Sequence, residues 1–255
     1  PAFLTLAIIP FGSKLGQQKM VIADLNVGIL YTFGIVSLGV YGIVLAGYAS
    51  NSKYPFLGGI RSSAQMISYE IAMGFALVGV LLAAGSLNLT HIVQAQTGPV
   101  WNWFWIPLLP LFMVYFIAGV AETNRAPFDL AEAESELTAG FHTEYSGMKF
   151  ALFFLAEYVN IFIVCSIAAT IFLGGWMPFH IGNLEAVNRV FDFIPGIVWF
   201  FGKVFALIFL IMWFRWTFPR LRIDQLLNLE WKYLLPIAMF NLLLTTLVAI
   251  SGWHF

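Results

Sequence analysis

The sequence predicts an all-α fold, a polytopic bundle of transmembrane helices with one long acidic loop on its cytoplasmic side. Of the 255 residues, 60% are hydrophobic and only 10% are charged, and the mean hydropathy is +0.86. An ordinary soluble domain carries roughly 25% charged residues, which cover its surface. Lipid offers the backbone no hydrogen-bond partners, so spanning segments of this composition are expected to be helices.

Six apolar runs are long enough to span a bilayer as helices, which takes about 20 residues. They cover residues 27–49, 66–87, 101–121, 148–174, 194–214 and 233–253. The apolar run PAFLTLAIIPFG at the start is too short to span, so we expect it to be the end of a further, partial transmembrane helix. Residues 1–255 show no internal repeat and are expected to form a single transmembrane domain.

Glycines are frequent in the first complete run, where small residues let helices approach closely. They stand at positions 28, 34, 39, 42 and 47, and close helix contacts are expected at each.

The distribution of Lys and Arg predicts the orientation of the bundle. Eight of the 12 Lys and Arg residues lie in the loops 50–65, 122–149 and 215–232, which share one side in a six-span arrangement. The loops on the other side hold only Lys14, Lys19 and Arg189. Because loops rich in Lys and Arg stay in the cytoplasm, the first three loops are expected there.

The loop 122–149 has an unusual composition. It holds six of the 13 acidic residues of the chain, together with Phe128, Phe141, His142 and Tyr145. Acidic residues contribute little to orientation, so topology does not explain them. Acids mixed with aromatics favour the wall of a cavity, while a solvated surface and a docking patch for a partner protein stay open as alternatives.

Two carboxylates and one lysine lie within predicted spans. Glu70, Glu157 and Lys203 would be costly there without a function or a partner. The alternatives are a proton-carrying role, a packing hydrogen bond and an ion pair, and Arg61 is a candidate partner of Glu70. Lys203 is expected either to pair with an acid or to extend its ammonium group to the membrane surface.

Other classes of chemistry find no support in the sequence. There is no phosphate-binding glycine loop, the four histidines show no metal spacing with the single Cys165, and no nucleophile motif appears. The net charge of −1 gives no indication of nucleic-acid binding. We therefore expect no metal and no bound redox cofactor in this chain.

Three long segments resemble one known family. ETNRAPFDLAEAESEL followed by GFHTEYSGMKFALFFLAEY, and PRLRIDQLLNLEWK near the end, are similar to the H subunit of bacterial NADH-quinone oxidoreductase. That family includes subunit 1 of mitochondrial NADH dehydrogenase, in respiratory complex I. The resemblance covers essentially the whole chain, but family members have eight transmembrane helices and carry further sequence before the part that matches here.

The resemblance implies a membrane-arm subunit of the proton-translocating NADH:quinone oxidoreductase of the respiratory electron-transport chain, without a redox centre of its own. Ubiquinone or menaquinone would be the substrate, and residues 122–149 would form the quinone-chamber loop. A carboxylate relay for protons would comprise Glu70, Glu122, Asp129, Glu132, Glu134, Glu136, Glu144 and Glu157. The implied quinone-chamber residues are Arg61, Arg125, Phe128, Phe141 and Arg222.

Partners follow from the same resemblance. They are the hydrophilic-arm subunits that carry the terminal iron–sulfur cluster, the adjacent membrane-arm subunits and membrane lipid. The expected location is the bacterial inner membrane, in preference to the mitochondrial inner membrane. Two alternatives are a membrane subunit of a related hydrogenase or formate hydrogenlyase complex, and a stand-alone ion-coupled secondary transporter. The transporter is disfavoured because no inverted repeat is visible.

Overall fold

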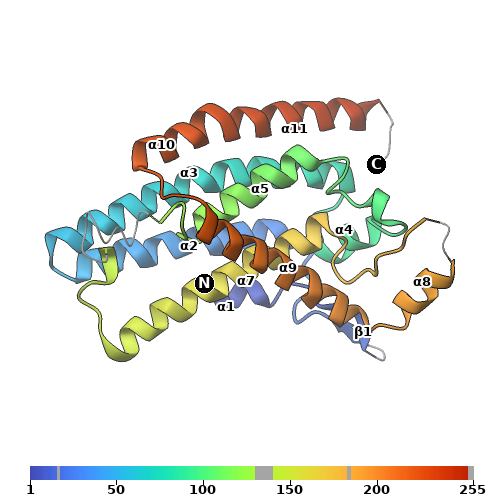
Figure 1. The fold of residues 1–255 in the computed structure, drawn as a ribbon, viewed down its shortest axis with the longest axis horizontal. Coiled ribbons are helices and arrows are strands. Elements are labelled where there is room, and N and C mark those ends of the chain that lie inside the picture. Colours follow the sequence, from blue (N-terminus) through green and yellow to red (C-terminus); the bar gives the residue numbers. More distant parts are fainter. Residues whose placement is uncertain (16–17, 130–139, 183–184, 252–255) are drawn as a thin grey trace.

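The long helices of the computed structural model run side by side and form the predicted polytopic bundle (Figure 1). The model describes residues 1–15, 18–129, 140–182 and 185–251. Within these residues, five apolar helical segments are long enough to cross a membrane. They are α2 (Gly28–Ala49), α3 (Lys53–Ala84), α7 (Gly147–Phe172), α9 (Gly196–Thr217) and a last segment made of α10 (Ile223–Leu229), the π-helical η3 (Glu230–Leu234) and α11 (Leu235–Ile250). A shorter apolar helix, α5, covers Leu109–Glu122.

Short elements connect the long helices. At the start of the described chain, α1 (Ala2–Leu6) has only five residues, and an antiparallel hairpin of β1 (Gly12–Leu15) and β2 (Gln18–Met20) follows it. The expected partial span is therefore a single short helical turn and a hairpin here. The remaining short elements are α4 (Leu89–Ala95), η1 (Val100–Asn102), η2 (Gly140–His142) and α8 (Glu185–Asp192).

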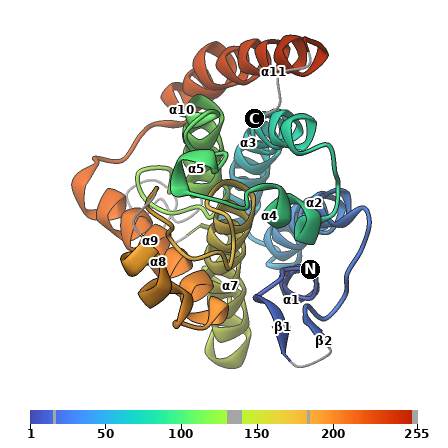
Figure 2. The same cartoon turned by 90° about the vertical axis from the view of Figure 1, so that its right-hand side faces the viewer.

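Helix α3 is the centre of the bundle. It packs against α2, α5 and α11, while α7 packs against α9 (Figure 2). Tyr69, Ala72, Ala76 and Val80 of α3 are fully buried and recur every three to four residues, so they lie along one face of the helix. The small residues among them allow the neighbouring helices to approach closely, which is how helix contacts form in lipid.

Three predicted spans have different bounds in the structure. The last one, expected at 233–253, begins ten residues earlier at Ile223, so residues 223–232 of the expected loop are helical. Helix α3 begins at Lys53, well before residue 66, because Pro55 lies in its first turn, where no intrahelical N–H bond is lost. The predicted span 101–121 is wrong in its first part, because α5 begins only at Leu109 and Pro110 stands in its first turn. Its 14 residues extend about 21 Å, less than the roughly 30 Å hydrocarbon layer.

The glycines of α2 only partly make the expected close contacts. A Cβ atom added to Gly47 would lie 2.8 Å from the carbonyl oxygen of Pro55, and one added to Gly28 would lie 3.1 Å from Ile8. At Gly34, Gly39 and Gly42 an added Cβ atom would meet nothing within 4 Å. The prediction of close contacts is confirmed at the two ends of α2, and in the middle of the helix the described residues of this chain do not test it.

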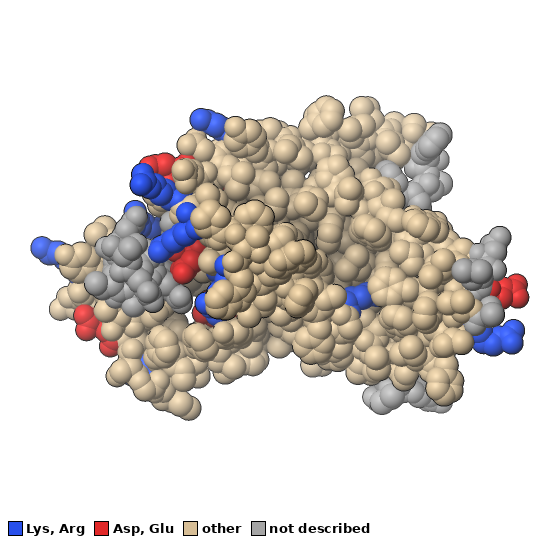
Figure 3. Space-filling view, viewed as in Figure 1, with Lys and Arg blue, Asp and Glu red and all other residues tan. Residues whose placement is uncertain are grey.

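Charged side chains gather at one end of the molecule (Figure 3). The turn between α2 and α3, the segment after α5 and the segment before α10 lie together there (Figure 1). The structure therefore places the three basic segments on one side, as predicted. Residues 53–65, which we expected to be a loop, belong to α3.

Candidate functional site

A cavity of about 530 Å³ lies at the charged end of the bundle. Its walls come from the middle of α2, the end of α5, the segment around η2 and the first half of α7. The lining is mainly apolar and aromatic, with a few polar groups: Glu122, Thr123, Asn124, His142, Tyr145, Lys149, Glu157 and Asn160. Size and composition are typical of a site for a small, largely apolar ligand.

Aromatic contacts hold the loop side of this cavity. The ring of Phe141 packs edge-on against Phe153 of α7, with 5.8 Å between ring centroids. The Tyr145 hydroxyl donates a hydrogen bond of 2.9 Å to the carbonyl of Ala46 in α2. The loop is thus fastened to both α2 and α7, and its rings face the cavity between them.

An ion pair lies at the edge of the cavity. Arg125 Nε is 2.8 Å from Glu157 Oε1, and the exposed fractions of the two side chains are 6% and 19%. The guanidinium carbon lies 4.8 Å from the ring centroid of Tyr158, one residue further along α7. The distance between the two charged groups defines an ion pair. The angles at Arg125 Nε and Nη2 do not meet those of a hydrogen bond with any described residue. The pair connects the segment after α5 to α7.

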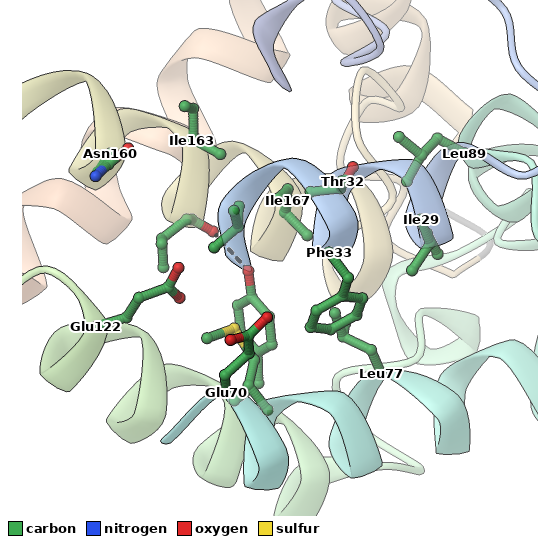
Figure 4. A pocket seen from close by; sticks show the side chains of 14 residues that line it. Ile29, Thr32, Phe33, Glu70, Leu77, Leu89, Glu122, Asn160, Ile163 and Ile167 are labelled. Atoms are coloured by element: carbon green, nitrogen blue, oxygen red, sulfur yellow. Dashed lines mark hydrogen bonds between the residues drawn. The ribbon is translucent and has the colours of Figure 1, made fainter. Parts of the chain in front are cut away.

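A second, small cavity of about 30 Å³ lies deeper in the bundle. Glu122 and Glu70 both line it, and Figure 4 shows their carboxyl groups directed toward the same space from α5 and α3. Glu122 and Asn160 line the large cavity as well. The two cavities therefore share one carboxyl group and one amide.

The Glu70 carboxyl has a partner in the neighbouring helix. The hydroxyl of Ser37 in α2 donates a hydrogen bond to Glu70 Oε1. The carbonyl oxygen of Phe33 lies 2.9 Å from the same Ser37 Oγ, so the two acceptors share the single hydroxyl proton. A side chain that bonds to a serine hydroxyl keeps its hydrogen-bonding geometry whether or not it carries a proton.

Comparison with known proteins gives the family of the chain. The family model described as NADH dehydrogenase matches residues 1–246. A protein of Bacteroides fragilis, named as the H subunit of NADH-quinone oxidoreductase, is 52% identical over 100% of this chain and 70% of its own length. The protein of the same name from Bacteroides thetaiotaomicron is 54% identical over the same shares.

The chain belongs to the NADH dehydrogenase family. Both the family and the helical membrane bundle predicted from the sequence are confirmed.

In this NADH dehydrogenase family member, the structure brings only some of the predicted site residues together. Glu122, Glu157 and Phe141 line the large cavity, and Glu70 lines the small one. Arg125 does not line the large cavity itself but forms an ion pair with Glu157, which does. Glu132, Glu134 and Glu136 lie outside the described residues.

The other predicted residues do not line these two cavities, although Glu144 lines an adjoining open cavity that shares Tyr145 and Lys149 with the large one. Phe128 is buried, with its ring centroid 5.7 Å from that of Tyr69 on α3. Glu144 and Arg222 are exposed, while Arg61 and Asp129 are half-buried. Their roles toward a ligand stay predictions.

Sequence reasoning missed several polar groups of the site. Asn160 follows Glu157 by one helical turn, so helical spacing alone could have placed it on the same face. Ser37 gave no such signal, because its partner Glu70 is far away in sequence. Glu230, a buried carboxyl outside both cavities, was also missed. A carboxyl within an apolar helical segment is costly without a function or a partner, as at Glu70.

Lys203 does neither of the two things predicted for it. Its ammonium group is buried and donates hydrogen bonds to the carbonyls of Leu173, Gly175 and Met177, at 2.7, 2.9 and 2.7 Å. It also lies 4.0 Å from the ring centroid of Trp103. Leu173 is the C-cap of α7, and Gly175 and Met177 lie in the segment that follows. The cation therefore bonds the carbonyl at the helix end, where it also complements the helix dipole, and ties the following segment to it.

Metal ligands are not gathered anywhere in the described part of this family member. No group of three or more His, Cys, Asp or Glu side chains could hold an ion there. Cys165 is buried within α7 and has no disulfide partner.

Proposed function

We propose that this chain is the membrane-embedded H subunit of a proton-translocating NADH:quinone oxidoreductase, complex I. Its large cavity would be part of the quinone chamber, and its carboxyl groups would carry protons from there into the membrane. The relatives' name, 52–54% identity over the whole chain and the spanning helices support this proposal. We further propose that the chain is one transmembrane domain in which residues 122–149 form the chamber loop.

One observation carries the proton-transfer part of the proposal. The carboxyl of Glu122 belongs to the walls of both cavities, so it lies between the chamber and Glu70. A quinone that accepts two electrons also takes up two protons to become a quinol. Carboxyl groups at a cavity can bind and release such protons, and clustered ones titrate as a coupled set. A change of charge at the quinone would thereby be felt at Glu70.

The large cavity suits a quinone ring as substrate. Its aromatic wall of Phe141, Phe150 and Phe153 offers stacking contacts, and Tyr145 and His142 offer polar groups near the ring oxygens. Either ubiquinone or menaquinone fits this chemistry. We propose that the partners are the hydrophilic-arm subunits that carry the terminal iron–sulfur cluster, the adjacent membrane-arm subunits and lipid. The proposed location is the bacterial inner membrane.

Photoaffinity labelling of the purified complex tests the chamber. A photoreactive quinone should label peptides that contain Phe141, Tyr145 or Phe153, and an excess of natural quinone should suppress this labelling. Labelling that excess quinone does not suppress, or labelling confined to other subunits, would contradict the assignment.

Purification separates the competing functions. A complex I subunit should co-purify with NADH-oxidising subunits, whereas a hydrogenase subunit should co-purify with a nickel-containing partner. A stand-alone transporter should be isolated without either set of partners and should move its ion when it is reconstituted alone.

A further inference from the structure

Glu230 is a buried carboxyl group that belongs to neither cavity. Its exposed fraction is 1%, and neither carboxyl oxygen has a hydrogen-bond partner of normal geometry in the described part of the structure. Its ionisable neighbours on the same segment, Asp224 and Lys232, are exposed. A buried carboxylate without a cation or a well-placed donor is strongly disfavoured, and such a group calls for an explanation.

The local helix geometry places this carboxyl against α3. Glu230 opens the π-helical segment η3, and such segments occur often at functional sites. The segment η3 packs directly against α3. The Tyr69 hydroxyl on α3 donates a hydrogen bond of 3.3 Å to the carbonyl of Leu226, one helical turn before Glu230.

The same face of α3 contacts the segment that enters the chamber loop. Gln65 precedes Tyr69 by four residues, so the two side chains lie on one face of the helix. Gln65 Nε2 donates hydrogen bonds to the carbonyls of Ala121 and Phe128, at 2.7 and 2.8 Å. Its Oε1 is buried without a hydrogen-bond partner among the described residues.

These side chains form a buried polar stripe, which we define as Gln65, Tyr69 and Glu230. The stripe has three unsatisfied oxygen atoms, Gln65 Oε1 and both oxygens of Glu230. Acceptors in such a place are satisfied by a bound proton or by buried water. Through the two hydrogen bonds of Gln65, the stripe is joined to the segment that carries Glu122.

We propose that Glu230 is a further proton-binding site of this subunit, on a different face of α3 from Glu70. Glu230 would hold a proton within the polar stripe. Its protonation would change on quinone reduction, because the two hydrogen bonds of Gln65 connect the stripe to residues 121–128. This inference deepens the proposed function and rests on it, because quinone reduction is the event that is sensed.

Infrared difference spectroscopy on the intact purified complex tests the proposal. Spectra are recorded between the oxidised state and the state reduced by NADH with quinone present. The wild type should show a carbonyl band of a protonated carboxylic acid that is absent in Glu230→Gln. The matched control Glu185→Gln, an exposed acid in α8, should keep the band. An unchanged spectrum for Glu230→Gln would overturn the proposal.

A second variant keeps the test decisive if Glu230→Gln prevents assembly. Tyr69→Phe leaves the carboxyl in place but removes the hydroxyl that bonds the Leu226 carbonyl one turn before Glu230, so the surroundings of the carboxyl change and the same band should shift in frequency. An unshifted band in an assembled Tyr69→Phe complex would overturn the proposal. Failure of the proposed function would look different, because a complex with no quinone reductase activity would show no quinone-linked spectrum at all.

Discussion

Arg125 Nε and Glu157 Oε1 lie 2.8 Å apart, and this ion pair connects the segment that follows α5 with the helix that follows the acidic loop. Both partners are largely buried, so each neutralises a charge that would otherwise be costly. The sequence left a proton-carrying role, a packing hydrogen bond and an ion pair open for Glu157, and the family resemblance implied the first. The pairing adds a structural role, which predicts how its variants behave.

Single replacements in this pair should impair assembly. Glu157→Gln strands the Arg125 guanidinium and Arg125→Gln strands the carboxylate, and each should cost about 3 kcal/mol. The yield of assembled complex and its melting temperature measure this loss. The double variant should recover much of the stability, because it leaves no unpaired charge. Additive losses in the double variant would show that the two side chains act independently.

Glu122→Gln should lower quinone reduction while assembly survives. Gln keeps the shape of the side chain but cannot bind and release a proton, and loss of a positioned proton carrier costs on the order of 10²-fold in rate. NADH oxidation should be measured with quinone and with a soluble electron acceptor. Only the quinone rate should fall, and Glu185→Gln should leave both rates unchanged. Equal losses with both acceptors would indicate an assembly defect.

Lys203→Met should destabilise the subunit. The variant leaves three carbonyls after the end of α7, which are buried or half-buried, without their donor, and we expect a loss of about 3 kcal/mol. Thermal inactivation of the purified complex measures this. Lys53→Met, at an exposed position, is the matched control. A melting temperature equal to that of the wild type would contradict the role of the ammonium group.

The orientation is testable by cysteine labelling. Cysteines at Asn51 and Asn228, which are exposed, should react from the cytoplasmic side, and one at Glu185 should react from the opposite side. The native Cys165 is buried and should give little background. Labelling of positions 51 and 228 from different sides would contradict the six-span arrangement.

Asp24 should make stability depend on pH. Hydrogen bonds from Lys19 and then Asn88 hold the pKa of the Asp24 carboxyl below its usual 3.8. A lowered folded-state pKa stabilises the fold above the unfolded value, and this contribution is lost as the pH falls through the folded value. The difference in melting temperature between wild type and Asp24→Asn should therefore shrink as the pH falls below about 4. A constant difference would contradict this account.

Composition and hydropathy were sufficient to predict most of the helices. The expected run 27–49 became Gly28–Ala49, and 148–174 became Gly147–Phe172. The errors arose at helix starts that contain proline. Pro55 lies in the first turn of α3, which begins earlier than predicted, and Pro110 lies in the first turn of α5, which begins later than predicted. The hairpin was not predicted, because its strands are too short to show a periodic pattern.

The candidate site was predicted in its residue types but not in its pairs. Charge in an apolar span pointed to Glu70 and Glu157, because such charges are rare without a role. Their partners, Ser37 and Arg125, come from other segments, and no spacing rule connects residues across helices. The partners of Lys203 are backbone carbonyls, which every residue carries, so no side-chain pattern in the sequence indicates them.

The open middle of α2 has a consequence for which molecules fit the large cavity. Gly39 and Gly42 line it, and a Cβ atom at either would meet nothing within 4 Å. Side chains there would grow into the empty volume without pushing the helices apart. Gly42→Ala or Gly39→Val should therefore reduce the cavity volume and exclude ligands with bulky ring substituents, while smaller rings still enter. The range of ligand sizes that the cavity accepts could thus be changed at these two positions without altering the packing of the helices.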